Sequence, residues 1–180
     1  MSKSALFMDI DGPLITHNQD YIIKLKRHIR LAAEICKEFN CDLIISSGSK
    51  DLIDVEKMES KVEWMDFILQ YFRKCGITKI DITPTVPKII NEYSYIDCWK
   101  EDEIRLYLYR HPEKEHYCVV DDNDKVRDLE KVKSHLVEVK WYSKDPKEEG
   151  LLPKHKEEIK KVLEKDNEIK KYILRKQNKN

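Results

Sequence analysis

The sequence predicts an α/β fold in which a mostly parallel central sheet carries helices on both faces. Three apolar runs support this prediction, at residues 5–8, 41–45 and 117–120. Each run is nearly continuous rather than alternating, which is typical of strands buried on both faces. The long helical segment between the first two strands favours a right-handed parallel crossover. At 180 residues, we expect a single domain covering residues 1–180.

The chain is rich in charged residues, but its positive and negative charges are equal in number. Hydrophobic residues make up 41% of the chain and charged residues 38%, and the formal net charge is zero. Global steering of a polyanion therefore gets no support from the net charge. No apolar stretch approaches the roughly 18 residues of a membrane span, and Met1-Ser2-Lys3 leads directly into the first strand. We expect a cytoplasmic protein with no membrane partner and no obligate protein partner.

The cysteines do not suggest a metal site. There are five of them, an odd number, scattered mostly through apolar segments, and none forms a CxxC pair. Reduced thiols in the core of an intracellular protein are the expected role, and a zinc site is not.

The first half of the chain alternates strands and helices. Residues 21–39 show helical spacing of apolar residues, and Asn18 or Asp20 can cap their start. The strand at 41–45 ends in the turn Ser46-Ser47-Gly48-Ser49. We then expect a short helix over 50–58 and a second helix that follows a capping box at 60–63 and ends at Gly76.

The second half continues this alternation. We expect a strand at 80–82, a proline-containing loop at 83–87, a helix at 100–109 and a strand at 117–120. A helix marked by Val126, Leu129 and Val132 and a strand at 135–139 should follow. From Pro153 onward we expect an amphipathic helix with a lysine-rich outer face, marked by Ile159, Leu163, Ile169 and Ile173, and a frayed end at 175–180.

Polar side chains follow three of the predicted strands where each strand ends. Asp9 and Asp11 follow the first strand, Ser46 the second, and Asp121 and Asp122 the strand at 117–120. The carboxyl ends of parallel strands lie side by side, so these residues should form one site with four carboxylates. Two carboxylates about 4 Å apart repel by roughly 4 kcal/mol at an effective dielectric near 20, which calls for a cation. Oxygen ligands without His or Cys favour Mg²⁺, and a hard dication beside a carboxylate suits phosphoryl transfer.

Each of these segments has a simpler explanation when it is taken alone. A calcium loop that began at Asp9 would need glycine and glutamate where the chain has Leu14 and Asp20. The acidic run after Val120 alone is typical of a turn and helix cap, and the serines after Ile45 of a strand-to-helix turn. The ordered set on three buried strands is what indicates a site.

At these residues the chain resembles the haloacid dehalogenase-like (HAD) superfamily, over roughly residues 5–152. The stretch Phe7-Met8-Asp9-Ile10-Asp11-Gly12 resembles the first motif, and Leu43-Ile44-Ile45-Ser46 the second. Lys100, with Arg105 and Arg110 nearby, stands where the basic residue of the third motif is expected. Val119-Val120-Asp121-Asp122 resembles the fourth motif.

The resemblance implies a three-layer Rossmann-like fold and a two-step phosphatase. Asp9 would attack phosphorus to form an aspartyl-phosphate, and Asp11 would act as general acid and base. The resemblance further implies Mg²⁺ bound by Asp9, the backbone carbonyl of Asp11 and Asp121, with Asp122 acting directly or through water. It also implies that Ser46, Ser47 and Lys100 bind the phosphoryl oxygens. Pro13 departs from the family pattern, because Thr or Val often stands there; it removes one N–H and stiffens the turn.

The spacing between motifs leaves little room for a lid. We expect a cap that is absent or is a small insertion over residues 50–98, and hence an open site that suits phosphates at the ends of large substrates. The resemblance extends to the compact HAD phosphatase domains of nucleic-acid repair proteins, including those fused to polynucleotide kinases. A phosphorylated DNA or RNA end, in a 3′-phosphatase reaction, is therefore the expected substrate.

Two other functions stay open. The first is a small-molecule phosphatase acting on nucleotides or sugar phosphates, in which Tyr93, Tyr95 and Trp99 stack a base instead of packing. The second is a catalytically silent HAD-like binding module. Basic residues on the segment 21–39 either hold a phosphodiester backbone or form a solvated helix face: Lys24, Lys26, Arg27 and Arg30.

Overall fold

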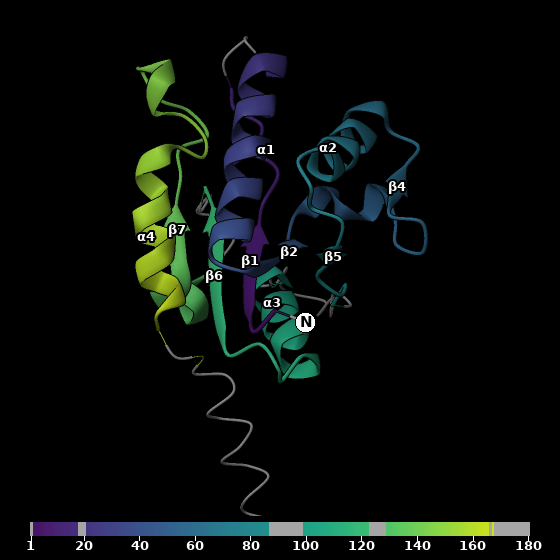
Figure 1. Cartoon of the computed structure of the whole chain (residues 1–180), viewed down its shortest axis with the longest axis vertical. Coiled ribbons are helices and arrows are strands. Elements are labelled where there is room, and N and C mark those ends of the chain that lie inside the picture. The colour runs from purple at the N-terminus through teal and green to yellow at the C-terminus, as the bar shows by residue number, and fades with distance from the viewer. Residues whose placement is uncertain (1, 18–20, 87–98, 123–128, 166, 168–180) are drawn as a thin grey trace, which may run out of the picture.

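The chain folds around a five-stranded parallel sheet with strand order β5-β2-β1-β6-β7 (Figure 1). The computed structural model describes residues 2–17, 21–86, 99–122, 129–165 and 167. The strands of this sheet are β1 (Ser4–Met8), β2 (Cys41–Ile45), β5 (Ile80–Ile82), β6 (His116–Asp121) and β7 (Leu136–Glu138). The helices are α1 (Tyr21–Glu38), α2 (Glu63–Lys74), α3 (Trp99–Arg110) and α4 (Pro153–Leu163). The α/β class predicted from the apolar runs is confirmed.

The central strand β1 is buried on both faces, as its continuous apolar sequence predicts. Leu6 and Met8 belong to a core that contains residues of α1, α2 and α4. Ala5 and Phe7 belong to a second core, formed with α3 and the 3₁₀ helix η2 (Glu130–His135). Alternate side chains of a strand point to opposite faces, so these two cores are the two helical layers on either side of the sheet.

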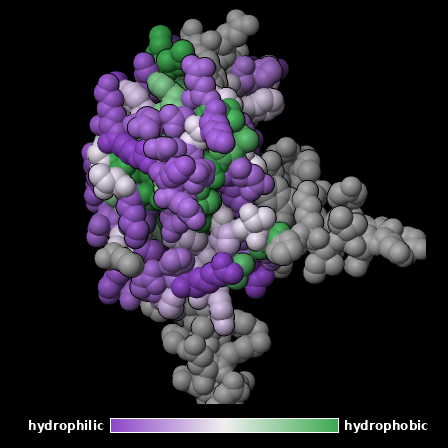
Figure 2. Space-filling view, turned by 90° about the vertical axis from the view of Figure 1, so that its right-hand side faces the viewer, coloured by the Kyte–Doolittle hydropathy of each residue, from purple (hydrophilic) through white to green (hydrophobic). Residues whose placement is uncertain are grey.

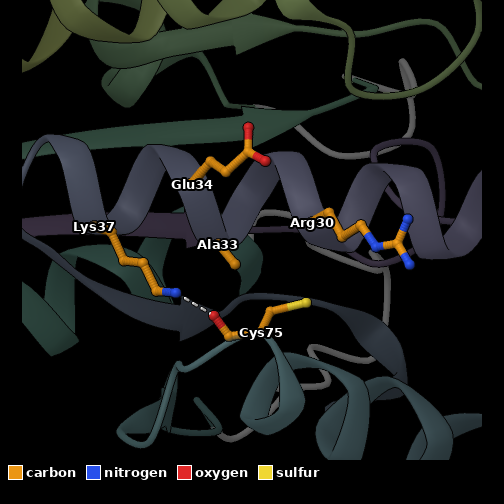
Figure 3. A pocket seen from close by; sticks show the side chains of 5 residues that line it. All are labelled: Arg30, Ala33, Glu34, Lys37 and Cys75. Atoms are coloured by element: carbon orange, nitrogen blue, oxygen red, sulfur yellow. Dashed lines mark hydrogen bonds between the residues drawn. The ribbon is translucent and has the colours of Figure 1, made fainter.

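A lysine of α1 binds the C-terminal end of α2. Lys37 of α1 donates a hydrogen bond to the backbone carbonyl of Cys75, directly after α2, beside a cavity of about 180 Å³ (Figure 3). Gly76 then turns the chain with φ +85°, and a Cβ there would lie 2.8 Å from the Lys37 ammonium. The predicted end of this helix at Gly76 is therefore confirmed, since only glycine fits the turn.

The segment that follows β2 differs from the sequence prediction. The expected helix over 50–58 is wrong: a 3₁₀ helix η1 (Gly48–Leu52) is followed by a hairpin of β3 (Ile53–Asp54) and β4 (Glu59–Ser60). The carboxylate of Asp54 accepts hydrogen bonds from the backbone N–H groups of Glu56 and Lys57, at 3.2 and 3.3 Å. These bonds offer the backbone a turn in place of a helix, and Met58, with φ +50°, completes the turn.

The predicted capping box of α2 is also wrong. The N-cap residue is Val62, which makes no side-chain cap hydrogen bond. Instead, the Ser60 hydroxyl accepts from the N–H of Val62 at 3.1 Å, and the N–H of Ser60 donates to Asp66 at 3.3 Å. The helix consequently begins at Glu63, three residues after the serine expected to cap it.

The remaining elements agree with the predictions where the structure describes them. Strands β5, β6 and β7 and helix α3 lie where the sequence places them, and η2 replaces the helix expected around Val132. Helix α4 begins at Pro153 as expected but ends at Leu163, earlier than the predicted helix. In the described part of 50–98, α2 packs on the α1 side of the sheet and β5 joins the sheet. Predictions for several positions lie outside the described residues or side chains: Asn18, Asp20, Tyr93, Tyr95, Trp99, Val126, Ile169, Ile173 and residues 175–180.

The surface reflects the high charge content. The face over α2 and the β3–β4 hairpin is mostly hydrophilic, with hydrophobic atoms in a few small groups (Figure 2). Among the described residues, no helix combines the length and the apolar character needed to cross a bilayer.

A buried histidine makes stability depend on pH. His28 of α1 is fully buried, and its Nδ1 lies 3.0 Å from the carbonyl oxygen of Leu14. Burial lowers the pKa of His28 below its ordinary value of 6.5, and nearby Arg27 and Lys24 lower it further against the opposing effects of Leu14 and Glu149. The unfolded chain therefore binds a proton more readily than the folded one.

We expect the contribution of His28 to the stability of the folded state to decrease as the pH falls through 6.5, its ordinary pKa, which the unfolded chain restores. His28→Gln retains a donor for the Leu14 carbonyl but cannot titrate. The difference in unfolding free energy between wild type and His28→Gln, measured with urea, should shrink by up to about 1.4 kcal/mol per pH unit below that value. A difference that stays constant from pH 7.5 to 5.5 would contradict this account.

Candidate active site

The candidate site lies at the carboxyl ends of three neighbouring strands. In the register of the sheet, Met8 of β1 is aligned with Ile45 of β2 and Val120 of β6. The N–H of Asp9 donates to the Val120 carbonyl at 3.0 Å, and the N–H of Ser46 donates to the Met8 carbonyl at 2.9 Å. Asp9, Ser46 and Asp121 thus follow three adjacent strands at the same edge, as the sequence predicts.

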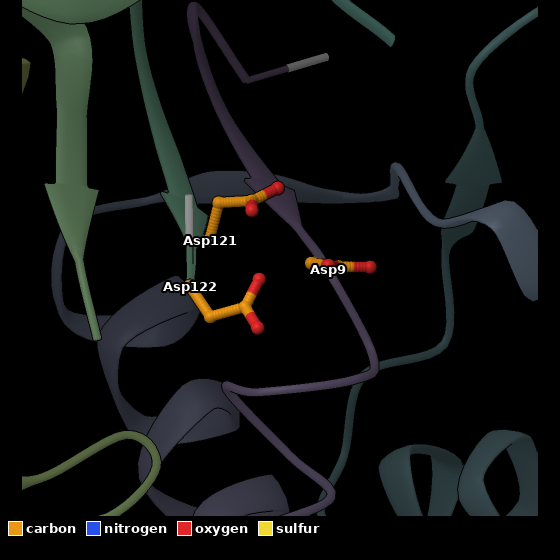
Figure 4. A group of neighbouring side chains, drawn as sticks. All are labelled: Asp9, Asp121 and Asp122. Carbon is orange, nitrogen blue, oxygen red and sulfur yellow. The ribbon is translucent and has the colours of Figure 1, made fainter. Parts of the chain in front are cut away.

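Three carboxylates meet at this edge. Oxygen atoms of Asp9, Asp121 and Asp122 all lie within 4.8 Å of one another, Asp9 at the end of β1 and the other two at the end of β6 (Figure 4). Asp9 and Asp121 are each only 1% exposed, and Asp122 is half-buried. Carboxylates at this spacing repel one another strongly when little water screens them.

A buried lysine of α3 provides positive charge opposite these carboxylates. Lys100, in the first turn of α3, places its Nζ 2.9 Å from Oδ2 of Asp9 and also donates a hydrogen bond to Asp121. The structure places this basic residue at the start of a helix, as the resemblance implies, and its partners here are the two buried carboxylates. Among the residues that the structure describes, the Lys100 ammonium contacts two of the three carboxylates, those of Asp9 and Asp121.

Burial and the closeness of these acids to one another raise their pKa values. Burial raises the pKa of Asp9, and the neighbouring Asp121 raises it further while Lys100 opposes both. Burial, together with Asp121 and Asp9, raises the pKa of Asp122 to about 7. The group is therefore electrostatically suited to accept a further positive charge.

Asp11 lies apart from the other three acids. Its side chain is exposed, and its carboxylate accepts a hydrogen bond from the hydroxyl of Ser49, at 3.4 Å, in the loop after β2. The expected group of four carboxylate side chains therefore contains three in the structure. Directly after Asp11, Gly12 turns the chain with φ +96°, and its N–H donates to the Ile15 carbonyl at 2.7 Å.

Gly12 also allows the turn to approach the fourth motif closely. A Cβ at Gly12 would lie 2.6 Å from the Cβ of Asp122. Both the positive φ and this contact require glycine, so the turn after Asp9 and the end of β6 pack directly against each other.

The serines after β2 have different environments. Ser46 is 1% exposed, and its hydroxyl makes no hydrogen bond within the part of the chain that the structure describes. A buried polar group of this kind is costly unless a ligand or water satisfies it. Ser47 caps η1, where its hydroxyl accepts from the N–H of Ser49 at 3.3 Å.

Sequence reasoning missed an ion pair that connects the loop after β2 to α3. Lys50 is 2% exposed and pairs with Glu103, which lies one turn beyond Lys100, and it donates to the Thr83 hydroxyl at 3.2 Å. The pair couples the serine loop to the helix that carries Lys100. No local pattern around Lys50 distinguishes it from the exposed lysines of the chain, so only the fold reveals it.

The basic residues of α1 are engaged within the chain. Lys26 lies 5.8 Å from the ring centroid of Phe67, and Arg30 lies 5.7 Å from that of Tyr71, both rings belonging to α2. Lys24 lies 3.6 Å from Glu149, and Arg27 lies 3.4 Å from the ring of His28. These contacts agree with a solvated helix face, and the binding of a phosphodiester backbone stays a prediction.

Comparison with known families agrees with this arrangement. The family model described as "HAD domain in Swiss Army Knife RNA repair proteins" matches residues 5–144, which include every site residue named above except Glu149. The chain belongs to this HAD family. No curated protein and no solved structure matches it.

Family membership explains the order of the motifs. In this HAD domain the strand-end aspartates, the serine and Lys100 come from segments far apart in the sequence and meet at one edge of the sheet. The RNA repair context agrees with the resemblance to nucleic-acid repair domains noted from the sequence, and it supports a phosphatase of the HAD type.

Proposed function

We propose that the protein is a Mg²⁺-dependent phosphomonoester hydrolase that removes the terminal phosphate, in a 3′-phosphatase reaction, from a nucleic-acid end. The observation that carries this proposal is the placement of Asp9 beside Asp121 and Asp122 with Lys100 among them. A carboxylate nucleophile, a second pair of acids and a lysine are the groups that phosphoryl transfer to an aspartate needs.

The residues present fit a magnesium ion. Their donors are carboxylate oxygens without His or Cys, which suit a hard dication better than zinc, and they lie within 4.8 Å of one another. Asp9, Asp121 and Asp122 would hold the ion through their side chains and Asp11 through its backbone carbonyl. When bound, the ion would neutralise negative charge on the phosphoryl oxygens.

The proposed reaction has two steps. A carboxylate oxygen of Asp9 forms a bond to phosphorus while the phosphorus–oxygen bond to the nucleic acid breaks, and Asp11 gives the leaving oxygen a proton. Water then attacks the aspartyl-phosphate, Asp11 takes up a proton, and inorganic phosphate and free Asp9 result. The exposed position of Asp11 suits it to reach a leaving group at the mouth of the site.

Phosphoryl oxygens would be held by groups at the end of β2 and the start of α3. The Ser46 hydroxyl is buried and has no hydrogen-bond partner among the described residues, and a phosphoryl oxygen would supply the missing partner. The Lys100 ammonium and the Ser47 segment would complete this cradle. The Lys50–Glu103 pair holds the two sides of the cradle together.

The substrate comparison tests this proposal. We expect Mg²⁺-dependent phosphate release from a 3′-phosphorylated oligonucleotide to exceed release from its 5′-phosphorylated counterpart and from the corresponding mononucleotide, and EDTA should abolish it. The measurement is kcat/KM for each substrate at one ionic strength, because phosphate contacts are salt-dependent. Equal or faster hydrolysis of mononucleotides would instead indicate a small-molecule phosphatase, and no hydrolysis of any phosphate ester would indicate a silent module.

A further inference from the structure

Three aromatic side chains meet at the surface, on two segments whose backbones lead away from the carboxylate site. Trp141 is 46% exposed, Tyr142 is 57% exposed, and His17 is also exposed. The ring centroid of His17 lies 5.0 Å from that of Trp141 and 5.4 Å from that of Tyr142, in edge-to-face arrangements. We call these three residues the aromatic platform.

The platform lies next to the site because both of its segments continue from site residues. The N–H of Val139 donates to the Asp121 carbonyl at 2.9 Å, and Trp141 follows two residues later. The other segment, which carries His17, follows the isolated β-bridge between Asp11 and Ile15. The N–H of His17 donates to the Trp141 carbonyl at 3.1 Å. Trp141 is therefore two residues along the chain from a backbone hydrogen bond to Asp121, the last residue of β6.

Hydrogen bonds within the chain hold the backbone that carries the platform. The buried carboxylate of Glu149 accepts a hydrogen bond from the N–H of Ser143 at 3.0 Å and lies 3.6 Å from the ammonium of Lys24. The N–H of Gly150 donates to the Lys140 carbonyl at 2.8 Å. The exposed rings are thus presented by a held segment, which reduces the entropy lost when a ligand stacks on them.

The charges around the platform suit a polyanion. Lys140 and Lys144 flank the aromatic pair and are exposed. The neighbouring acids are engaged within the chain: the Asp145 carboxylate accepts from the N–H of Lys147 at 2.9 Å, and Glu148 pairs with Lys154. Lysines that flank exposed aromatic rings are the combination that binds single-stranded nucleic acid.

We propose that the aromatic platform stacks the base of the nucleotide that carries the terminal phosphate. This inference rests on the proposed function of Asp9 and specifies its substrate as an unpaired nucleic-acid end. Unpaired bases stack on Trp, Tyr and His side chains, and every base has a π face, so the platform tolerates any terminal base. A base held beside the site positions its phosphate at the carboxylates.

The test compares Trp141→Ala and Tyr142→Ala with a matched control. Tyr109 of α3 is 62% exposed, so Tyr109→Ala removes an exposed ring of the same kind at the far end of the helix that begins with Trp99 and Lys100. The substrates are a 3′-phosphorylated oligonucleotide and the same oligonucleotide with an abasic terminal nucleotide. We expect Trp141→Ala to lower kcat/KM on the first by about 5- to 150-fold and on the second by less than twofold or so.

The other variants distinguish a stacking role of the ring from a structural one. Tyr142→Ala should show a smaller loss of the same pattern, Trp141→Phe should retain most of the activity because a ring remains, and Tyr109→Ala should match the wild type. Equal losses on the base-bearing and abasic substrates would show a structural role for Trp141 and overturn the inference. Unchanged kcat/KM on the base-bearing substrate would overturn it as well.

Two further measurements separate this inference from the proposed function. Hydrolysis of acetyl phosphate, which carries no base, reports the chemistry alone, and its absence in the wild type would count against the function of Asp9. Fluorescence anisotropy of the two oligonucleotides with Asp9→Asn protein reports the platform alone. We expect tighter binding of the base-bearing strand, and Trp141→Ala in that background should abolish the difference.

Discussion

Replacement of Asp9 by Asn is expected to lower phosphatase kcat by at least about a thousandfold, as loss of a nucleophile does in other enzymes. The amide is nearly the same size as the carboxylate but is not a nucleophile toward phosphorus. Asp9 is buried and its Oδ1 accepts a hydrogen bond from the N–H of Ile10 at 2.8 Å, which the amide oxygen can accept equally. The turn after β1 should therefore be retained, and the loss should fall on the chemistry.

The measurement is phosphate release with Mg²⁺ together with an acid-quenched test for labelled protein. Wild type incubated with an oligonucleotide carrying a ³²P-labelled 3′-phosphate should trap label on the protein, and Asp9→Asn should trap none. Asp54→Asn, which changes an exposed aspartate in the β3–β4 hairpin, serves as the control and should behave as wild type. If Asp9→Asn retained activity within tenfold of wild type, the aspartyl-phosphate mechanism would be wrong.

Replacement of Lys100 by Met is expected to destabilise the metal-free protein by about 3 kcal/mol at neutral pH. Its ammonium is buried between Asp9 and Asp121, and its removal takes away a cation that offsets the charge of both carboxylates. Breaking a buried pair from one side typically costs about 3–5 kcal/mol, because the remaining charge cannot regain water.

Urea unfolding in EDTA and in Mg²⁺ checks this result. The ion should restore part of the lost stability, since it binds the folded state and supplies countercharge at the same place. Lys3→Met is the matched control: Lys3 pairs with Glu115 at the surface, with side chains 72% and 39% exposed, and its loss should cost less than about 1 kcal/mol. A Lys100→Met protein as stable as wild type in EDTA would mean that the acids need no internal countercharge.

The sequence predicts the sheet and the strand-end residues well because both depend on local patterns. A strand buried on both faces must be continuously apolar, so Leu6, Phe7 and Met8 identify β1, and the abrupt change to Asp9 identifies its end. The same reasoning finds Ser46 and Asp121. The topology then brings these ends together without any further information from the sequence.

Features that depend on distant partners could not be predicted in this way. The Lys50–Glu103 pair and the contacts of Lys100 join residues from different elements, and their burial is set by the fold. The β3–β4 hairpin was missed because the turn at Asp54 outweighs the helical spacing of the residues around it. The aromatic platform joins His17 to Trp141 and Tyr142, which no spacing rule connects.

The two outermost strands of the sheet, β5 and β7, are each only three residues long. An exposed sheet edge offers unpaired backbone groups as a template on which another chain can add a strand, and short edge strands weaken that template. The longer strands β1, β2 and β6 are enclosed between neighbours. This arrangement protects the apolar centre of the sheet from edge-to-edge aggregation, so the protein can keep an acidic, ligand-accessible rim without a wide surface open to strand addition.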